Sequence, residues 1–158
     1  MLVKFRLNGH HVEKEASPNE TLLDFLRLRF KITSVKKGCD LGECGTCTVL
    51  LDGKPVRSCL ILAVQVNGSS VTTVEGISGA ELNLIQRAFV ENYGFQCGFC
   101  TPGMVLAAKA LLDENPNPRA DDIKEALDGH LCRCTGYEQI IESVLKASEL
   151  MKRSQQRT

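Results

Sequence analysis

The sequence lacks several features that would each point to a particular class of protein. No apolar run approaches the roughly 18 residues that a membrane-spanning helix needs. Lysine plus arginine equals aspartate plus glutamate, at 19 each, so there is no excess positive charge to suggest nucleic-acid binding. Only three histidines are present, and His10 and His11 lack the C-x-H spacing of a Rieske-type site. Histidine ligation of an iron–sulfur cluster is therefore not expected.

Motifs for bond-making chemistry are also absent. There is no Ser–His–Asp or paired-carboxylate pattern, and Gly42 and Gly45 are not followed by the Gly-Lys-Ser/Thr of a phosphate-binding loop. The N-terminal residues alternate between apolar and charged, without the continuous apolar segment of a signal peptide. We therefore expect a cytoplasmic protein, in which grouped cysteines are metal ligands rather than disulfide partners.

What the sequence does have is eight cysteines in two sets of four. The first set has the spacing C-x4-C-x2-C-x11-C, which is the plant-type pattern that holds a [2Fe–2S] cluster through four thiolates. Its members are Cys39, Cys44, Cys47 and Cys59. A structural zinc fits this triplet poorly, because zinc sites usually pair two short knuckles or add histidines. A redox dithiol at Cys44 and Cys47 would leave the other two without a role.

The second set is C-x2-C followed much later by C-x-C. Its members are Cys97, Cys100, Cys132 and Cys134. Each pair precedes a predicted helix, whose positive N-terminal end would favour thiolates. Spacing alone favours a second cluster here but leaves zinc and a redox pair open.

The pattern of apolar residues divides the chain, whose 158 residues suit one domain or two. In the first half, Asn8-Gly9 and Asp52-Gly53 predict two β-hairpins. A helix is predicted to start at Ser17–Glu20, and residues 71–74 to form a closing strand.

From about residue 78 the periodicity becomes helical. Four helices are predicted, with Pro102 in the first turn of the second and residues 115–118 ending it. Leu82 is expected on the apolar face of the first, and the chain from Lys152 onward is expected to be frayed. The predicted fold is α+β, with a small β-rich domain at residues 1–77 that carries the first cysteine set and a helical domain at residues 78–158 that carries the second.

Three segments together resemble the small iron–sulfur subunit of molybdenum hydroxylases, the family of xanthine dehydrogenase, aldehyde oxidoreductase and carbon monoxide dehydrogenase. They are Gly38–Val49 (GCDLGECGTCTV), Gln96–Met104 (QCGFCTPGM) and Leu131–Tyr137 (LCRCTGY). The resemblance covers nearly the whole chain. It implies an N-terminal ferredoxin-like β-grasp domain and a C-terminal four-helix bundle, each with one [2Fe–2S] cluster.

The resemblance also implies partners. A large subunit would hold the molybdopterin, in contact with Gln96 and beside Cys134, which would also ligate iron. Electrons would pass from molybdenum through both clusters to FAD on a medium subunit or to another acceptor. The alternatives are a stand-alone two-cluster electron carrier and a zinc-stabilised interaction module. Substrate contacts would belong to another chain, so purines, aldehydes, carbon monoxide, N-heteroaromatics and aromatic acyl-CoA thioesters all stay open.

One position departs from the family pattern. His130 stands where asparagine is common, two residues before Cys132. It could be a tolerated polar residue at a helix end. It could instead tune the nearby cluster, in which case the midpoint potential should vary between pH 5 and 8.

Overall fold

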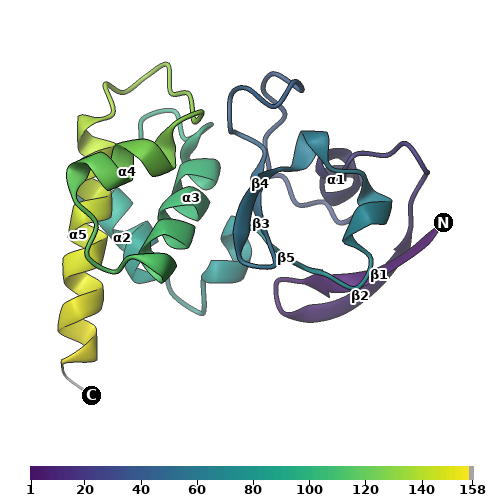
Figure 1. Ribbon diagram of the computed structural model, residues 1–158, viewed down its shortest axis with the longest axis horizontal. Helices are drawn as coiled ribbons and strands as arrows, with labels where there is room; N and C mark the ends of the chain where they lie inside the picture. Colours follow the sequence, from purple (N-terminus) through teal and green to yellow (C-terminus); the bar gives the residue numbers. More distant parts are fainter. Residues whose placement is uncertain (157–158) are drawn as a thin grey trace.

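The computed structural model describes residues 1–156. Figure 1 shows a sheet with short helical turns beside a part made of helices. The order of secondary structure confirms the α+β class, with a ferredoxin-like part and a helical part. Within the described residues, no helix combines the length and apolar character needed to cross a membrane.

The sheet has five strands in the order β2-β1-β5-β3-β4. Strands β1 (Leu2–Leu7) and β5 (Ser70–Thr72) are parallel, whereas β1 pairs antiparallel with β2 (His10–Glu15), and β3 (Thr48–Leu51) pairs antiparallel with β4 (Lys54–Arg57) and with β5. The closing strand ends at Thr72, two residues before its predicted end.

Both predicted hairpins are confirmed. Asn8 and Gly9 have φ values of 51° and 84°, and Asp52 and Gly53 have 49° and 83°. Positive φ at both central residues defines the type I′ turn, whose twist matches that of the flanking strands. The register pairs Leu7 with His10 across the first turn.

The first predicted helix begins later than expected. Ser17–Glu20 forms a turn in which the Ser17 backbone N–H donates to the Glu20 carboxylate at 3.1 Å. Helix α1 spans only Leu22–Asp24, with the Thr21 hydroxyl accepting from the Asp24 N–H, and continues as a π-helical turn at Phe25–Arg29. The segment buries its apolar side chains against the sheet, namely Leu22, Leu23, Phe25 and Leu26.

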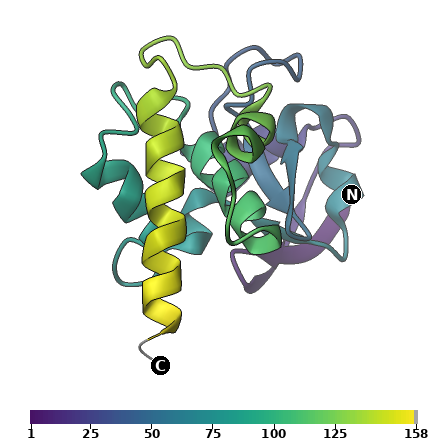
Figure 2. The same ribbon diagram turned by 60° about the vertical axis from the view of Figure 1, so that its left-hand side comes forward.

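Between residues 78 and 156 the chain forms four α-helices, as predicted: α2 (Leu84–Glu91), α3 (Thr101–Glu114), α4 (Ala120–Leu127) and α5 (Glu138–Gln155). Their apolar faces share one core. Figure 2 shows α5 running along this part of the molecule.

Two details of the helical prediction are wrong. Leu82 precedes the Asn83 N-cap of α2 and is 50% exposed, so it is not on the buried face. Helix α5 continues past Lys152 to Gln155, so the frayed end does not begin where predicted. Residues 157–158 lie outside the described residues.

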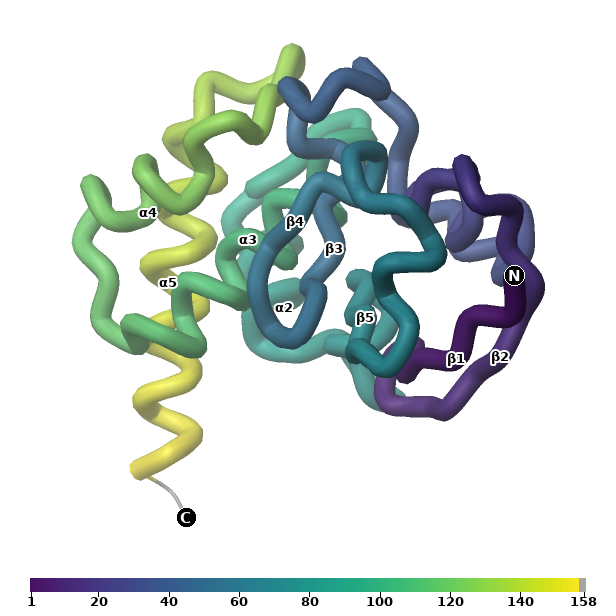
Figure 3. The backbone as a smooth tube through the Cα atoms, turned by 45° about the vertical axis from the view of Figure 1, so that its right-hand side comes forward, coloured from purple at the N-terminus to yellow at the C-terminus, as the bar shows by residue number. Residues whose placement is uncertain are grey.

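The two parts meet along a seam between α3 and strands β3 and β4. Figure 3 shows the loop near residue 40 (blue) beside the loop near residue 130 (green). The Leu131 N–H donates to the Cys44 carbonyl at 3.0 Å, and the Arg57 guanidinium donates to the Gly129 carbonyl at 2.9 Å. The two cysteine-bearing loops are therefore in direct contact.

Gly45 tests how closely this seam is packed. Its φ is +73°, and a Cβ there would lie 2.7 Å from the Gly129 oxygen and 2.9 Å from the His130 Cα. We expect Gly45→Ala to lower the free energy of unfolding by more than the ~1 kcal/mol cost of alanine at positive φ, measured by chemical denaturation. Gly53→Ala is the control, because Gly53 has φ +83° and no neighbour within 4 Å of the added Cβ. Equal losses in the two variants would show that the seam can accommodate the added methyl group.

Candidate metal centres

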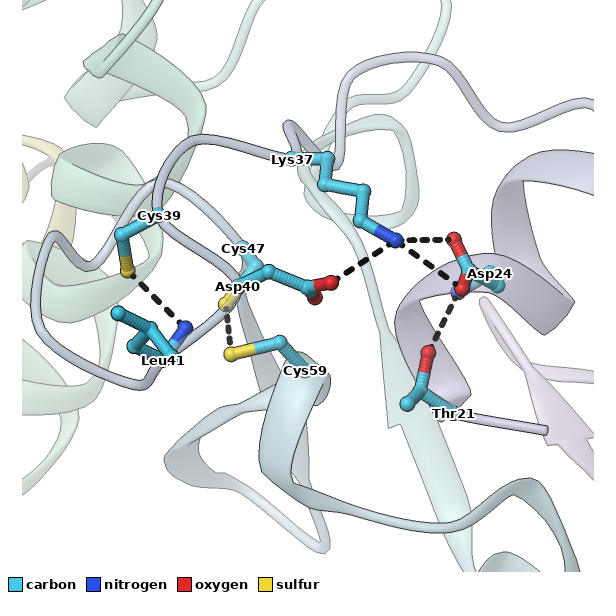
Figure 4. Close-up of polar contacts among 8 residues, drawn as sticks. All are labelled: Thr21, Asp24, Lys37, Cys39, Asp40, Leu41, Cys47 and Cys59. Atoms are coloured by element: carbon cyan, nitrogen blue, oxygen red, sulfur yellow. Dashed lines mark hydrogen bonds and ion pairs between the residues drawn. The ribbon is translucent and has the colours of Figure 1, made fainter. Parts of the chain in front are cut away.

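The first set of cysteines converges from two segments. Cys39, Cys44 and Cys47 lie on the loop before β3, and Cys59 lies in the short helical turn Ser58–Leu60 after β4. The sulfurs of Cys47 and Cys59 are 3.4 Å apart and both residues are buried (Figure 4). The hairpin β3–β4 brings this pair together, because it reverses the chain between the two residues.

Cys39 and Cys44 lie on the outer side of the same loop and are half-buried. The Cys39 sulfur accepts from the Leu41 and Cys44 backbone N–H groups, each at 3.4 Å. These two donors lower the pKa of the Cys39 thiol to about 7. Burial, with the neighbouring Cys47 thiol, raises the pKa of Cys59 to about 11.

The start of this loop is tied to α1. The Lys37 ammonium contacts the Asp24 carboxylate at 3.2 Å and the Asp40 carboxylate at 3.0 Å (Figure 4). The hydrogen bonds to Asp40 and Asp24 raise the pKa of Lys37. Lys37, the residue before Gly38, therefore links the start of the cysteine-bearing loop to α1.

The second set also converges from two segments. Cys97 lies in the loop before α3 and Cys100 is the N-cap residue of that helix, while Cys132 and Cys134 lie in the loop before α5. The thiol of Cys97 interacts with that of Cys134, and the thiol of Cys100 with that of Cys132. Burial, followed by the interaction with Cys132, raises the pKa of Cys100 to about 12. The Phe99 backbone N–H, followed by Cys134, lowers the pKa of Cys97.

The sulfurs are therefore arranged as neighbouring pairs. Within residues 1–156, no three Cys, His, Asp or Glu side chains surround a position for a single ion. A [2Fe–2S] cluster takes two protein ligands on each of its two irons, so pairs of thiols suit it. Gly38 adds to the fit, because a Cβ there would lie 2.8 Å from the Cys44 sulfur. The donor chemistry and the close backbone both suit a cluster.

The two residues predicted to contact a pterin lie at the exposed edge of the second set. Gln96 precedes the exposed Cys97, and Cys134, the partner of Cys97, is also exposed. Gln96 and Cys134 are therefore both accessible from solvent. Cys100, in contrast, is buried in the helical core.

His130 is neither at a solvated helix end nor free to titrate near neutrality. It is 4% exposed, and its Nε2 lies 3.0 Å from the Thr48 hydroxyl and 3.2 Å from the Arg57 guanidinium. Because a guanidinium can only donate, Nε2 accepts and Nδ1 carries the hydrogen. Burial, followed by the Arg57 charge, lowers the pKa of His130 to about 4. His130 is therefore a neutral residue of the seam, a role that its position in the sequence did not reveal.

Further contacts within the two cysteine-bearing loops could not be predicted from the sequence. The Thr46 hydroxyl lies 3.2 Å from the Cys44 sulfur, and the Thr135 hydroxyl donates to the Cys132 sulfur at 3.1 Å. The Tyr137 hydroxyl donates to the His130 carbonyl and accepts from the Cys132 N–H. The only available signal was that both threonines follow a cysteine within three residues.

Comparison with known proteins matches both halves of the chain to iron–sulfur families. The family described as "2Fe-2S iron-sulfur cluster binding domain" matches residues 5–67, and "[2Fe-2S] binding domain" matches residues 73–145. The chain is thus a protein with two [2Fe–2S] domains, and it binds two clusters.

Individual relatives narrow the class. The chain is 48% identical to the nicotinate dehydrogenase small FeS subunit of Eubacterium barkeri, covering 93% of this chain and 94% of the relative. It is 47% identical to a probable xanthine dehydrogenase subunit of Bacillus subtilis (strain 168), covering 90% and 83%. The structure of quinoline 2-oxidoreductase from Pseudomonas putida 86 superposes with a TM-score of 0.93 at 45% identity, covering 97% and 96% of the two chains. The chain belongs to the family of small iron–sulfur subunits of molybdenum hydroxylases, and it is the electron-transfer subunit of an oxidoreductase complex.

The buried His130 generates a prediction about pH. Its folded-state pKa of about 4 lies below the unfolded value of 6.5, so the folded state resists protonation. The contribution to stability is complete above about pH 6.5 and is lost as the pH falls toward 4. Chemical denaturation from pH 4 to 7 should show this loss, and His130→Asn should remove that part of the pH dependence.

Because His130 stays neutral above pH 5, it should contribute no pH dependence to the midpoint potential of either cluster between pH 5 and 8. Potentials that vary in that window in the natural protein, but not in His130→Asn, would show instead that His130 titrates there.

Proposed function

We propose that the eight cysteines are the eight ligands of the two clusters, four on each half of the chain. The observation that carries this proposal is the convergence of the thiols: the Cys47 and Cys59 sulfurs are 3.4 Å apart, and the thiols of Cys134 and Cys132 shift the pKa values of Cys97 and Cys100. Cys39 and Cys44 are the other two members of the first set, and the Cys44 N–H donates to the Cys39 sulfur. Two pairs in each half are what two irons per cluster require.

We also infer two domains, at residues 1–77 and 78–158. Two separate apolar cores support a division, one beneath the sheet and one among α2–α5, with Val74 and Ile77 at the boundary packed against the second. The first domain would have the ferredoxin-like β-grasp fold and the second the four-helix bundle of the family. Each domain would then hold one cluster, close to the seam that the two domains share.

The proposed path of electrons begins at a molybdopterin on a large partner subunit. Gln96 and Cys134 would face that pterin, which is supported by their exposed position. The second cluster would pass electrons to the first across the seam, where only one hydrogen bond separates Cys44 from the residue preceding Cys132. The first cluster would then reduce FAD on a medium subunit, and we propose the cytoplasm as the compartment.

The exposed surface near the first set supports a partner there. Leu41 lies between Cys39 and Cys44 and is 72% exposed, and Leu60, next to Cys59, is 61% exposed. Exposed apolar side chains of this kind mark contact surfaces when they gather around a site. The stand-alone carrier is the less favoured alternative, because the relatives are named as subunits.

The substrate is set by other chains of the complex. The relatives are named for nicotinate and xanthine, and the matched structure for quinoline. One type of electron-transfer subunit thus accompanies enzymes for different substrates. This chain would do no substrate chemistry itself.

Ligand substitution tests the proposal. The dithionite-reduced protein should give two S = 1/2 EPR signals and about four irons per chain. Cys59→Ser should perturb the signal of the first cluster alone, and Cys100→Ser that of the second alone. One signal with about two irons in the natural protein, or loss of both signals in one folded variant, would contradict the assignment.

A second prediction concerns the pterin contact. Gln96→Ala should leave both EPR signals intact and lower turnover of the assembled enzyme about tenfold, as expected for losing a hydrogen bond of roughly 1.4 kcal/mol. Gln139→Ala is the control, because Gln139 is also exposed but lies on α5. Unchanged turnover in Gln96→Ala would argue that Gln96 does not contact the pterin.

A further inference from the structure

Two threonine hydroxyls contact sulfurs of the proposed ligands, one in each half of the chain. Thr135 lies three residues after Cys132, and its hydroxyl donates to the Cys132 sulfur at 3.1 Å. Thr46 lies two residues after Cys44, with its hydroxyl 3.2 Å from the Cys44 sulfur. A thiolate has no hydrogen, so in a loaded cluster the hydroxyl is the only possible donor in each contact.

The Thr135 hydroxyl is free to give its hydrogen to sulfur. Its oxygen accepts from the Tyr137 N–H at 3.4 Å, and the Thr135 N–H donates to the same Cys132 sulfur at 3.3 Å. Tyr137 is itself fixed, because its hydroxyl joins the His130 carbonyl to the Cys132 N–H. The hydroxyl therefore donates its one hydrogen to the sulfur and accepts from the Tyr137 N–H.

The Thr46 hydroxyl has competing acceptors. It lies 3.3 Å from the Lys36 carbonyl as well as 3.2 Å from the Cys44 sulfur, and it has only one hydrogen to donate. Thr46 is 5% exposed, so water does not offer a simple replacement. The sulfur contact in the first domain is therefore shared, whereas that in the second is not.

From this difference we propose that the Thr135 hydroxyl raises the reduction potential of the second cluster through its hydrogen bond to Cys132, and that Thr46 does the same for the first cluster to a smaller extent. Reduction adds one electron to the [2Fe–2S] core, supplied by molybdenum in turnover or by dithionite in a titration, and the hydroxyl keeps its proton. The added negative charge strengthens a hydrogen bond to the sulfur, so the bond stabilises the reduced state more than the oxidised state. The proposal rests on the ligand assignment made above.

The chain offers a matched control beside another ligand of the same cluster. Thr101 follows Cys100, and within residues 1–156 its buried hydroxyl has no hydrogen-bond partner. Replacing Thr101 by valine removes a hydroxyl near the second cluster without removing a contact to sulfur. General effects of the Thr→Val change on packing and polarity near the cluster are therefore present in this control as well.

The experiment is an EPR-monitored redox titration of the full chain loaded with both clusters. Thr135→Val should lower the equilibrium constant for one-electron reduction of the second cluster about tenfold, which is 59 mV for one electron. The first cluster should keep its potential. Thr135→Ser should retain the natural reduction potential of the second cluster, and Thr101→Val should leave that potential unchanged. Thr46→Val should lower only the first cluster's potential, by a smaller factor.

Three results would overturn the inference while leaving the ligand assignment intact: an unchanged potential in Thr135→Val, an equal shift in Thr101→Val, or a shift that serine fails to rescue. Resonance Raman spectra give a second readout, because loss of the hydrogen bond should shift the Fe–S(Cys) stretching bands in Thr135→Val and not in Thr135→Ser. Natural protein that lacks the second EPR signal would instead contradict the ligand assignment itself.

Discussion

The structure depends on holding cysteine sulfurs against one another in a low-dielectric setting. Thiolates so close together repel each other, and the iron ions and nearby hydrogen-bond donors offset that repulsion. The chain supplies backbone donors to Cys39 from Leu41 and Cys44 and to Cys132 from Thr135. Each set draws its four sulfurs from two segments, so a hairpin or a helix pair must close before the site exists.

Each proposed cluster has an inner and an outer side. Cys47, Cys59 and Cys100 are buried in the two cores, whereas Cys97 and Cys134 are exposed and Cys39 and Cys44 are half-buried. In the proposed assignment, the inner ligands would fix the cluster to its domain, and the outer ligands would bring it to the surface. An electron relay between partner subunits needs both, because the cluster must be held rigidly and still be reached from outside.

The seam holds the two cluster-binding parts of the chain together. Backbone contacts between Cys44 and Leu131, together with the group formed by His130, Thr48 and Arg57, connect the ligand loops directly. A neutral, buried histidine suits this place, since a charged one would lie beside the Arg57 guanidinium. The seam therefore depends on packing and on hydrogen bonds more than on charge.

Elements that depend only on neighbours along the chain can be predicted from the residue pattern. Asn8-Gly9 and Asp52-Gly53 specify their turns through local φ preferences, Pro102 suits the first turn of α3, and the spacing of Cys39, Cys44 and Cys47 indicates a cluster loop. The three-dimensional structure was needed to show which sulfurs pair, that α1 ends early in a π-helical turn, and that His130 is buried against Arg57. It alone revealed the different hydrogen-bonding of Thr46 and Thr135. These features arise from contacts between residues that are distant in sequence or from hydrogen-bond geometry, and no residue pattern encodes either one locally.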